Sequence, residues 1–193
     1  MLVPIRSFDD AKTRLAEVLD AAERHSLARA MATAVVRAAL DLPVVVVTDD
    51  AEVIEWANTV DARALPVGVA GLNPSVSAAV DSLAAEGVER VIVAHADLPH
   101  ARDLRHVDGA AVAIVPDRHG DGSNVLSVPT GAGFRFAYGP GSFARHQAEA
   151  RRLGLGFEVV DDPDLAWDVD GPDDLPFDWR ELLPLDLEGD LER

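Results

Sequence analysis

The stretch Leu42-Pro43-Val44-Val45-Val46-Val47-Thr48 places four successive valines between a proline and a threonine. An unbroken β-branched run, without polar alternation, predicts a strand that is buried on both faces, as in a parallel sheet. Residues 91–94 and 110–115 form two further runs of this kind. Shorter strands are predicted at residues 2–5, 62–65, 125–128, 134–136 and 157–160.

Helical patterns alternate with these strands along most of the chain. Asp20 precedes Glu23 by three residues, as in a capping box, and an apolar stripe of Leu27, Met31 and Val35 follows at helical spacing. Further helices are predicted at residues 52–58, at 75–86 after the Asn73-Pro74 start, and from Gly141-Ser142 to near residue 154. Strands alternating with helices predict an α/β fold with a mainly parallel sheet covered on both faces.

The composition fits one domain and excludes several classes of partner. The chain has 193 residues, of which 48% are hydrophobic, enough for a single domain with a sizeable core. Thirty-four acidic residues against 17 basic ones argue against nucleic acid and against anionic membrane surfaces as partners. Neither a signal peptide nor a membrane-length apolar run is present, so the expected location is the cytoplasm. We expect the domain to span residues 1–175 and the acidic segment 176–193 to form a tail, with Trp179 as its best packing anchor.

The loop after the first predicted strand carries three cations in nine residues. They are Arg6, Lys12 and Arg14, and Lys12 is the only lysine of the chain. In a protein of net charge −17, such a cluster attracts phosphates by a local field. Ligand sites of α/β proteins lie where strands end, so we expect a nucleotide triphosphate here. The alternative is a solvated loop that happens to be basic.

Two acidic clusters also stand where strands are predicted to end. Asp97 closely follows the strand at 91–94, and Asp168 and Asp170 have the period-two spacing that points both side chains the same way in an extended segment. Carboxylates that converge at one sheet edge repel each other unless a cation lies between them. Mg²⁺ takes oxygen ligands and bridges to phosphates, so we predict a magnesium site. The alternatives are a helix cap for Asp97 and a surface turn for Asp170.

Two glycine-rich segments are candidate anion sites. The segment 117–124 offers close backbone approach together with the donors Ser123 and Asn124, although a mobile loop fits its composition almost as well. Gly139 to Ser142 leads into a predicted helix, whose N-terminus favours anions; Ser142 as a plain N-cap is the competing interpretation. A turn at Gly71-Leu72-Asn73 says little by itself. The six histidines show no metal-binding spacing, and we assign no histidine base.

Taken in order, these stretches resemble the guanylyltransferases of deazaflavin (coenzyme F-420) biosynthesis, which act on 2-phospho-L-lactate or phosphoenolpyruvate. The resemblance covers roughly residues 2–175 and rests on six segments: 11–15, 71–73, 96–99, 117–124, 138–143 and 168–175. It implies a three-layer α/β/α fold similar to that of nucleotide-diphospho-sugar transferases, with a mainly parallel mixed sheet. It also implies Mg²⁺ on Asp97, Asp168 and Asp170, and a nucleotide site that includes Arg6, Lys12, Arg14, Gly71 and Asn73. The phosphorylated three-carbon acid would be held by Ser123, Asn124, Gly139 and Ser142.

The reaction implied by the resemblance is attack of the acid's phosphate oxygen on the α-phosphorus of GTP, with release of pyrophosphate. Lys12 and Arg14 would neutralise the triphosphate and the leaving pyrophosphate. Alternatives are another nucleotidyltransferase or a glycosyltransferase of the same fold, or a non-catalytic nucleotide-binding regulator. The sequence leaves open which acid is used and which base is preferred. It also leaves the oligomeric state open, with a homodimer as one alternative.

Overall fold

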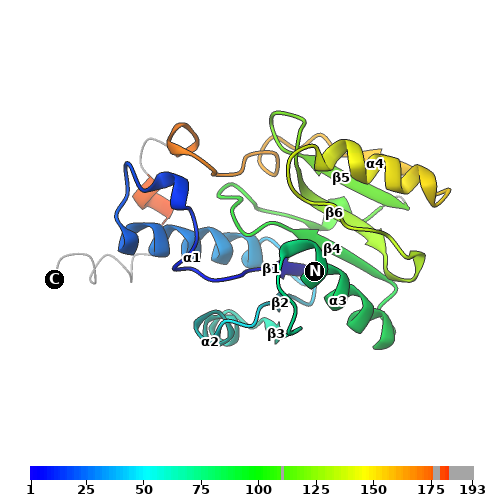
Figure 1. Ribbon diagram of the computed structural model, residues 1–193, viewed down its shortest axis with the longest axis horizontal. Coiled ribbons are helices and arrows are strands. Elements are labelled where there is room, and N and C mark those ends of the chain that lie inside the picture. Colours follow the sequence, from blue (N-terminus) through cyan, green and yellow to red (C-terminus); the bar gives the residue numbers. More distant parts are fainter. Residues whose placement is uncertain (110, 176–178, 183–193) are drawn as a thin grey trace.

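The computed structural model describes residues 1–109, 111–175 and 179–182 (Figure 1). One mixed sheet carries seven strands, in the order β3-β2-β1-β4-β6-β5-β7. These strands are β1 (Leu2–Pro4), β2 (Val45–Val47), β3 (Arg63–Leu65), β4 (Arg90–Ala94), β5 (Val112–Pro116), β6 (Ser123–Pro129) and β7 (Phe157–Val159). The α-helices are α1 (Ala21–Arg37), α2 (Ala51–Thr59), α3 (Leu72–Ala85) and α4 (Ser142–Arg152). Short 3-10 helices are η1 (Thr13–Leu15), η2 (Arg105–Val107), η3 (Thr130–Ala132), η4 (Pro172–Asp174) and η5 (Trp179–Leu182).

The sheet is mainly parallel, as predicted. Strands β3, β2, β1 and β4 pair in parallel, and so do β5 and β7. Strand β6 runs antiparallel to both of its neighbours, β4 and β5. The chain therefore continues from β1 to β2 on one side and reaches β4 on the other, so a topological switch point lies between β1 and β4. In open α/β sheets this is where the crevice for a ligand forms.

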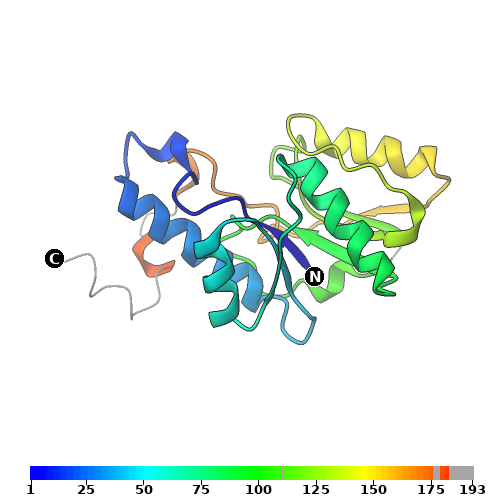
Figure 2. The same ribbon diagram turned by 60° about the horizontal axis from the view of Figure 1, so that its bottom comes forward.

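Apolar residues of the central strands face two separate cores. Val46, Val3 and Ile92 pack with α1 and α2, whereas Val45 and Val47 pack with α3. Figures 1 and 2 show α1 and α2 apart from α3 and α4, with the sheet between the two groups. Alternate residues of one strand thus enter opposite cores, which explains why the valine run lacks polar alternation. The three-layer α/β/α expectation is confirmed.

The first long helix begins where the capping pattern predicts it. The Asp20 side chain accepts the backbone N–H of Glu23 at 2.9 Å, and the Glu23 carboxylate accepts the N–H of Asp20 at 3.0 Å. This reciprocal pair satisfies two of the donors left unpaired at a helix start. Leu27 and Met31, both buried, then point into a core that also includes Leu15 and Trp179.

The predicted strand at residues 134–136 is wrong, for a reason visible in its contacts. Phe134, Phe136 and Tyr138 are buried at alternate positions, as the residues of a half-buried strand would be. No strand pairs with this segment in the described part of the chain, because side chains take the place of a β-ladder. The backbone N–H groups of residues 135, 137 and 138 donate to Glu149, His146 and Asn73, respectively.

Several element boundaries also differ from the prediction. Helix α3 begins at Leu72 rather than at residue 75, with Gly71 as its N-cap at φ 96°. Pro74 then lies in the first turn, where its missing N–H costs no hydrogen bond. Strand β2 is shorter than the valine run and β6 is longer than predicted, while Ala110 lies outside the described residues.

Trp179, the expected anchor of the C-terminal tail, is buried in the core formed by Leu27, Met31 and Val169. In Figures 1 and 2 the short red helix η5, which begins with Trp179, lies beside α1. The rest of the predicted tail, 176–178 and 183–193, lies outside the described residues. Within the described part of the chain, no helix has the length and apolar character needed to cross a membrane.

Candidate active site

A cavity of about 270 Å³ opens at the switch point between β1 and β4. The loops that follow these two strands form much of its wall, from Ile5 to Lys12 and from His95 to Asp97. Phe8, Met31 and Leu72 give the cavity an apolar side, whereas Lys12 and Asp97 give it a charged one. A ligand with both an apolar part and charged groups would find both kinds of surface here.

Lys12 joins the basic loop to both acidic segments. Its Nζ donates to Asp97 Oδ2 at 2.5 Å and lies 3.6 Å from Asp170 Oδ1. The Lys12 backbone has φ 55°, in the left-handed region that a residue with a Cβ adopts only at a cost. Its side chain is only 11% exposed. Arg14 approaches the other oxygen of Asp170 at 3.4 Å, while Arg6 is largely exposed and pairs with Asp10.

The three predicted metal ligands meet at the carboxyl edge of β4. The backbone N–H of Val169 donates to the carbonyl oxygen of Asp97 at 3.2 Å, which holds the 168–170 segment against the end of β4. Asn124, at the adjacent start of β6, donates to Asp168 Oδ1 at 3.3 Å. The sequence placed these residues far apart, and the sheet order brings them together.

The charges of these carboxylates influence one another. Burial would raise the pKa of Asp97, but the positive charges of Lys12 and His95 hold it below its ordinary value. Burial and the negative charge of Asp97 raise the pKa of Asp168. Asp97 Oδ1 is buried and has no hydrogen-bond partner in the described part of the chain. Three carboxylates thus meet beside the cations Lys12 and Arg14, and one buried oxygen of Asp97 stays open as an acceptor among the described residues.

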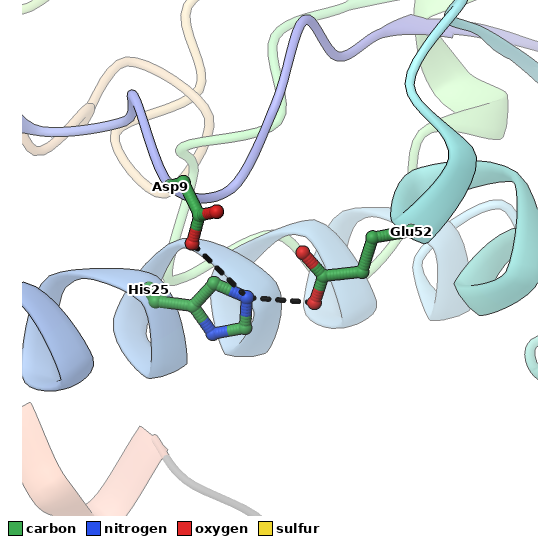
Figure 3. Close-up of side chains that lie close together, drawn as sticks. All are labelled: Asp9, His25 and Glu52. Carbon is green, nitrogen blue, oxygen red and sulfur yellow. Dashed lines mark hydrogen bonds and ion pairs between the residues drawn. The ribbon is translucent and has the colours of Figure 1, made fainter.

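The three aspartates do not form the tightest group of candidate ligands. Among residues 1–109, 111–175 and 179–182, only Asp9, His25 and Glu52 have three ligand atoms all within 4.8 Å of one another. Figure 3 shows the His25 ring between the two carboxylates: its Nε2 lies 2.7 Å from Glu52 Oε1 and 3.9 Å from Asp9 Oδ1. Since Asp9 belongs to the loop that carries Lys12, this group ties that loop to α1 and α2. The arrangement suits an ion pair or a metal ion.

The two glycine-rich segments lie together, as one expects of a shared site. Asp121 accepts the N–H of Gly141 on its carboxylate at 2.9 Å, and its carbonyl oxygen accepts the N–H of Phe143 at 3.0 Å. Asp117 organises the first segment by accepting the N–H groups of His119, Asp121 and Gly122. The 117–124 segment is thus a fixed turn held by a carboxylate.

The predicted acid-binding residues differ in how accessible they are. Gly139 is exposed, whereas Ser123, Asn124 and Ser142 are buried. The N-cap of α4 is Gly141, so the interpretation of Ser142 as a plain N-cap is wrong. Ser123 faces His146 at 3.0 Å, a buried histidine to which the sequence pattern assigned no role.

The predicted nucleotide-site residues at the start of α3 have different surroundings. Leu72 lines the cavity directly. The Asn73 amide instead bonds the backbone of Tyr138 through both of its ends, at 2.6 and 3.3 Å. Gly71 supplies the positive φ that starts the helix beside the cavity.

Arg118 and Asp174 are two further residues to which the sequence pattern assigned no role. Both lie inside the motifs at residues 117–124 and 168–175, but an arginine and an aspartate 56 positions apart show no spacing signal. Their side chains form an ion pair beside the 168–171 segment. Only the folded chain reveals this pairing.

The fold is that of the nucleotide-diphospho-sugar transferases. A crystal structure from Desulfovibrio desulfuricans, described as a nucleotide-diphospho-sugar transferase, is similar with a TM-score of 0.67 at 19% identity, over 88% of this chain and 81% of that one. Within this class the sequence is more specific. The chain belongs to the guanylyl transferase CofC-like family, whose family model matches residues 1–178.

Curated relatives cover nearly the same span. Phosphoenolpyruvate guanylyltransferase of Conexibacter woesei is 37% identical over 195 residues, covering 94% of this chain and 87% of the relative. 2-phospho-L-lactate guanylyltransferase of Methanocaldococcus infernus is 26% identical over 179 residues, covering 90% of this chain and 81% of the relative. Membership of this family identifies the chain as a nucleotidyltransferase and confirms the resemblance found in the sequence.

Proposed function

We propose that this chain joins GTP to phosphoenolpyruvate and releases pyrophosphate, as a step of coenzyme F-420 biosynthesis. The observation that carries the reaction type is the meeting of Lys12 with Asp97 and Asp170 at the switch-point cavity. The choice of acid rests on similarity, since the phosphoenolpyruvate enzyme of C. woesei is closer in sequence than the 2-phospho-L-lactate enzyme of M. infernus. 2-phospho-L-lactate is the alternative acid.

The chemical step needs positioning and charge neutralisation. An oxygen of the acid's phosphate attacks the α-phosphorus of GTP. The bond between that phosphorus and the oxygen bridging the α- and β-phosphates breaks, and pyrophosphate leaves with the electron pair. Because the attacking oxygen is already anionic near neutral pH, no general base is required. Lys12 and Arg14 stabilise the charge that develops on the leaving pyrophosphate. The exposed Arg6 assists at the rim of the cavity.

Mg²⁺ is the metal we propose for Asp97, Asp168 and Asp170. The residues fit it, because all three offer carboxylate oxygens and Asp97 Oδ1 is a buried acceptor for which the described residues supply no donor. When bound, the ion would supply charge neutralisation for the reacting phosphates. Asn124 orients Asp168 through their 3.3 Å hydrogen bond.

The acid is proposed to bind at the joined glycine-rich segments. Gly139 is exposed, so its backbone groups are accessible to the acid. Ser142 lies in the first turn of α4, where the helix dipole favours an anion. Ser123 and Asn124 are buried at the start of β6, where Ser123 contacts His146 of α4, so we assign them a supporting role behind this site. The Asp121 carboxylate accepts the Gly141 N–H and so holds the two segments against each other.

The test is a matrix of four nucleoside triphosphates against phosphoenolpyruvate, 2-phospho-L-lactate and 3-phosphoglycerate, read by pyrophosphate release in the presence of Mg²⁺. We expect the highest kcat/KM for GTP with phosphoenolpyruvate. The Asp97→Asn variant should lose most of this turnover, because a neutral amide is a poor ligand for Mg²⁺. Turnover that requires a sugar phosphate, or that needs no acid at all, would contradict the proposal.

A further inference from the structure

The segment that carries Asp168 and Asp170 lacks the support of a β-ladder. Residues 160–171 belong to no strand or helix, so neighbouring strands do not fix the direction of these two side chains. Two carboxylates that must converge on one ion need a backbone held to within a fraction of an ångström. Some other group must supply that constraint.

Asp174 binds one side of this segment. It is the last residue of η4 and is buried. Its Oδ2 accepts the backbone N–H of Asp170 at 2.7 Å and that of Gly171 at 2.6 Å. Two charge-assisted hydrogen bonds, both accepted by one carboxylate oxygen, therefore set the backbone at Asp170.

Arg118 binds the other side. Its guanidinium pairs with Asp174 Oδ1, donates to the carbonyl oxygen of Asp168 at 3.4 Å, and lies 4.3 Å from the centre of the Trp167 ring. Its backbone N–H donates to the carbonyl oxygen of Ala166 at 2.9 Å. Arg118 comes from the glycine-rich segment after β5, so it also couples that segment to Asp168.

The charges of the pair suit this position. An aspartate packed against the segment that carries Asp168 and Asp170 would add negative charge there if it stood alone, but the Arg118 guanidinium neutralises Asp174. Asp174 can therefore accept two N–H groups without acting as a fourth charge in the acidic cluster. Its neighbour Asp173 is exposed and makes none of these bonds, so the role belongs to one of two adjacent aspartates.

We propose that Arg118 and Asp174 are positioning residues that hold Asp168 and Asp170 in the geometry required for the divalent ion. The inference rests on the proposed metal site. Neither residue needs to touch the ion or a substrate. Loss of the pair lowers metal affinity by letting the 168–171 segment adopt other conformations.

The experiment measures Mn²⁺ binding to the full-length protein by electron paramagnetic resonance, using Asp174→Asn and, as a matched control, Asp173→Asn. Both variants carry His25→Ala, which removes the other candidate ligand group at Asp9, His25 and Glu52. We expect Asp174→Asn to weaken Mn²⁺ binding at least tenfold and to raise the half-activating Mg²⁺ concentration by a similar factor. Asp173→Asn should match the His25→Ala parent in both measurements.

Two further variants keep the outcomes separate. Asp97→Asn tests the metal site itself: Mn²⁺ binding equal to that of the parent would refute the proposed site rather than the positioning pair. If Mn²⁺ binding depends on Asp97 but a folded Asp174→Asn variant binds as tightly as the parent, the positioning role is refuted. Should Asp174→Asn fail to fold, Arg118→Lys decides, because lysine keeps the charge but cannot bond Asp174 and Asp168 in the same geometry. Parent-like Mn²⁺ binding and Mg²⁺ activation in Arg118→Lys would then overturn the inference.

Discussion

At the scale of single residues, Lys12 has the most unusual environment in the site. It combines a left-handed backbone, a nearly buried ammonium group and contacts to two carboxylates from distant parts of the chain. Such backbone strain persists only where surrounding contacts over-determine it. The ammonium group lies between Asp97 and Asp170, next to the space where we propose that a divalent ion binds, so Lys12 and the ion compete for the charge of the same two carboxylates.

Replacing Lys12 by methionine should therefore have opposite effects on two measurements. Without the competing ammonium, Mn²⁺ should bind roughly tenfold more tightly in the absence of nucleotide, which corresponds to about 1.4 kcal/mol. Turnover should fall about a hundredfold or more, since the charge at the leaving pyrophosphate is lost. The Arg37→Met variant removes one positive charge at the far end of α1 and should change neither value. Weaker Mn²⁺ binding in Lys12→Met would contradict this view of the site.

Ser142 gives a second test at this scale. Because Gly141 is the N-cap of α4, Ser142→Ala should leave the melting temperature nearly unchanged. If its hydroxyl binds the acid, KM for the acid should rise about tenfold to a hundredfold while KM for GTP stays the same, as expected when a hydrogen bond to a charged group is lost. Equal increases in both KM values would place this turn elsewhere in the site.

At the scale of elements, α4 is attached to the sheet through a buried histidine. His146 is fully buried; its Nε2 accepts the Ala137 N–H at 3.0 Å, and its Nδ1 lies 3.0 Å from Ser123 Oγ. With Nε2 occupied as an acceptor, the proton of the neutral ring belongs on Nδ1, which donates to Ser123. Burial, together with the nearby positive charges of Arg145 and His95, lowers the pKa of His146 to about 4. The helix therefore packs around an uncharged ring.

This shift gives the stability a dependence on pH with a definite sign. The unfolded chain takes up a proton at His146 near its ordinary pKa of 6.5, whereas the folded chain does so only near 4. The buried neutral ring makes its full contribution to the free energy of unfolding above pH 6.5, and this contribution is lost as the pH falls toward 4. The loss amounts to roughly 2 kcal/mol between pH 7 and pH 5. Urea unfolding at the two pH values should show this loss in the wild type and a smaller loss in His146→Gln. The exposed His119→Gln variant should keep the wild-type difference.

At the scale of the whole molecule, the C-terminal segment, α1 and the acidic site share one core. Trp179 packs with Leu27 and Met31 of α1, and the same cluster contains Leu15 after the basic loop and Val169 between the two aspartates. Because Leu15 lies near Lys12 and Val169 is next to Asp170, the packing of this core helps to set the distance between Lys12 and Asp170. We propose that the functional domain extends beyond residue 175, to include η5.

Trp179→Ala should lower the free energy of unfolding by about 3 kcal/mol, the usual cost of removing a buried tryptophan. Truncation after Leu175 should cost at least as much. The exposed Val18→Ala substitution serves as control and should stay within about 0.5 kcal/mol of the wild type. Guanidinium denaturation measures all three changes. A truncated chain as stable as the full one would show that this segment is dispensable.

The sequence by itself determined the architecture, because the signals for strands and helices are local. Unbroken valine runs predict strands buried on both faces, and the sheet places Val46 and Val47 in opposite cores. The capping pattern at Asp20 predicts the start of α1. The family could also be identified from the sequence, because the order of the motifs along the chain does not depend on their tertiary contacts. The strand predicted at residues 134–136 is absent although its side chains alternate between core and surface. Such alternation shows which side chains face the core, but it does not show which groups accept the backbone N–H groups.

Only the tertiary structure decided how the site is assembled. Lys12 meets Asp97 across 85 positions, Arg14 meets Asp170 across 156, and Arg118 meets Asp174 across 56. These pairings follow from the order of strands in the sheet, which brings the ends of β1 and β4 and the start of β6 to one edge. A charge on a loop carries no local signal of its partner, because electrostatic contacts depend on distance in space and not on spacing along the chain. The residue types were therefore readable from the sequence, while the path of the chain determined which of them meet.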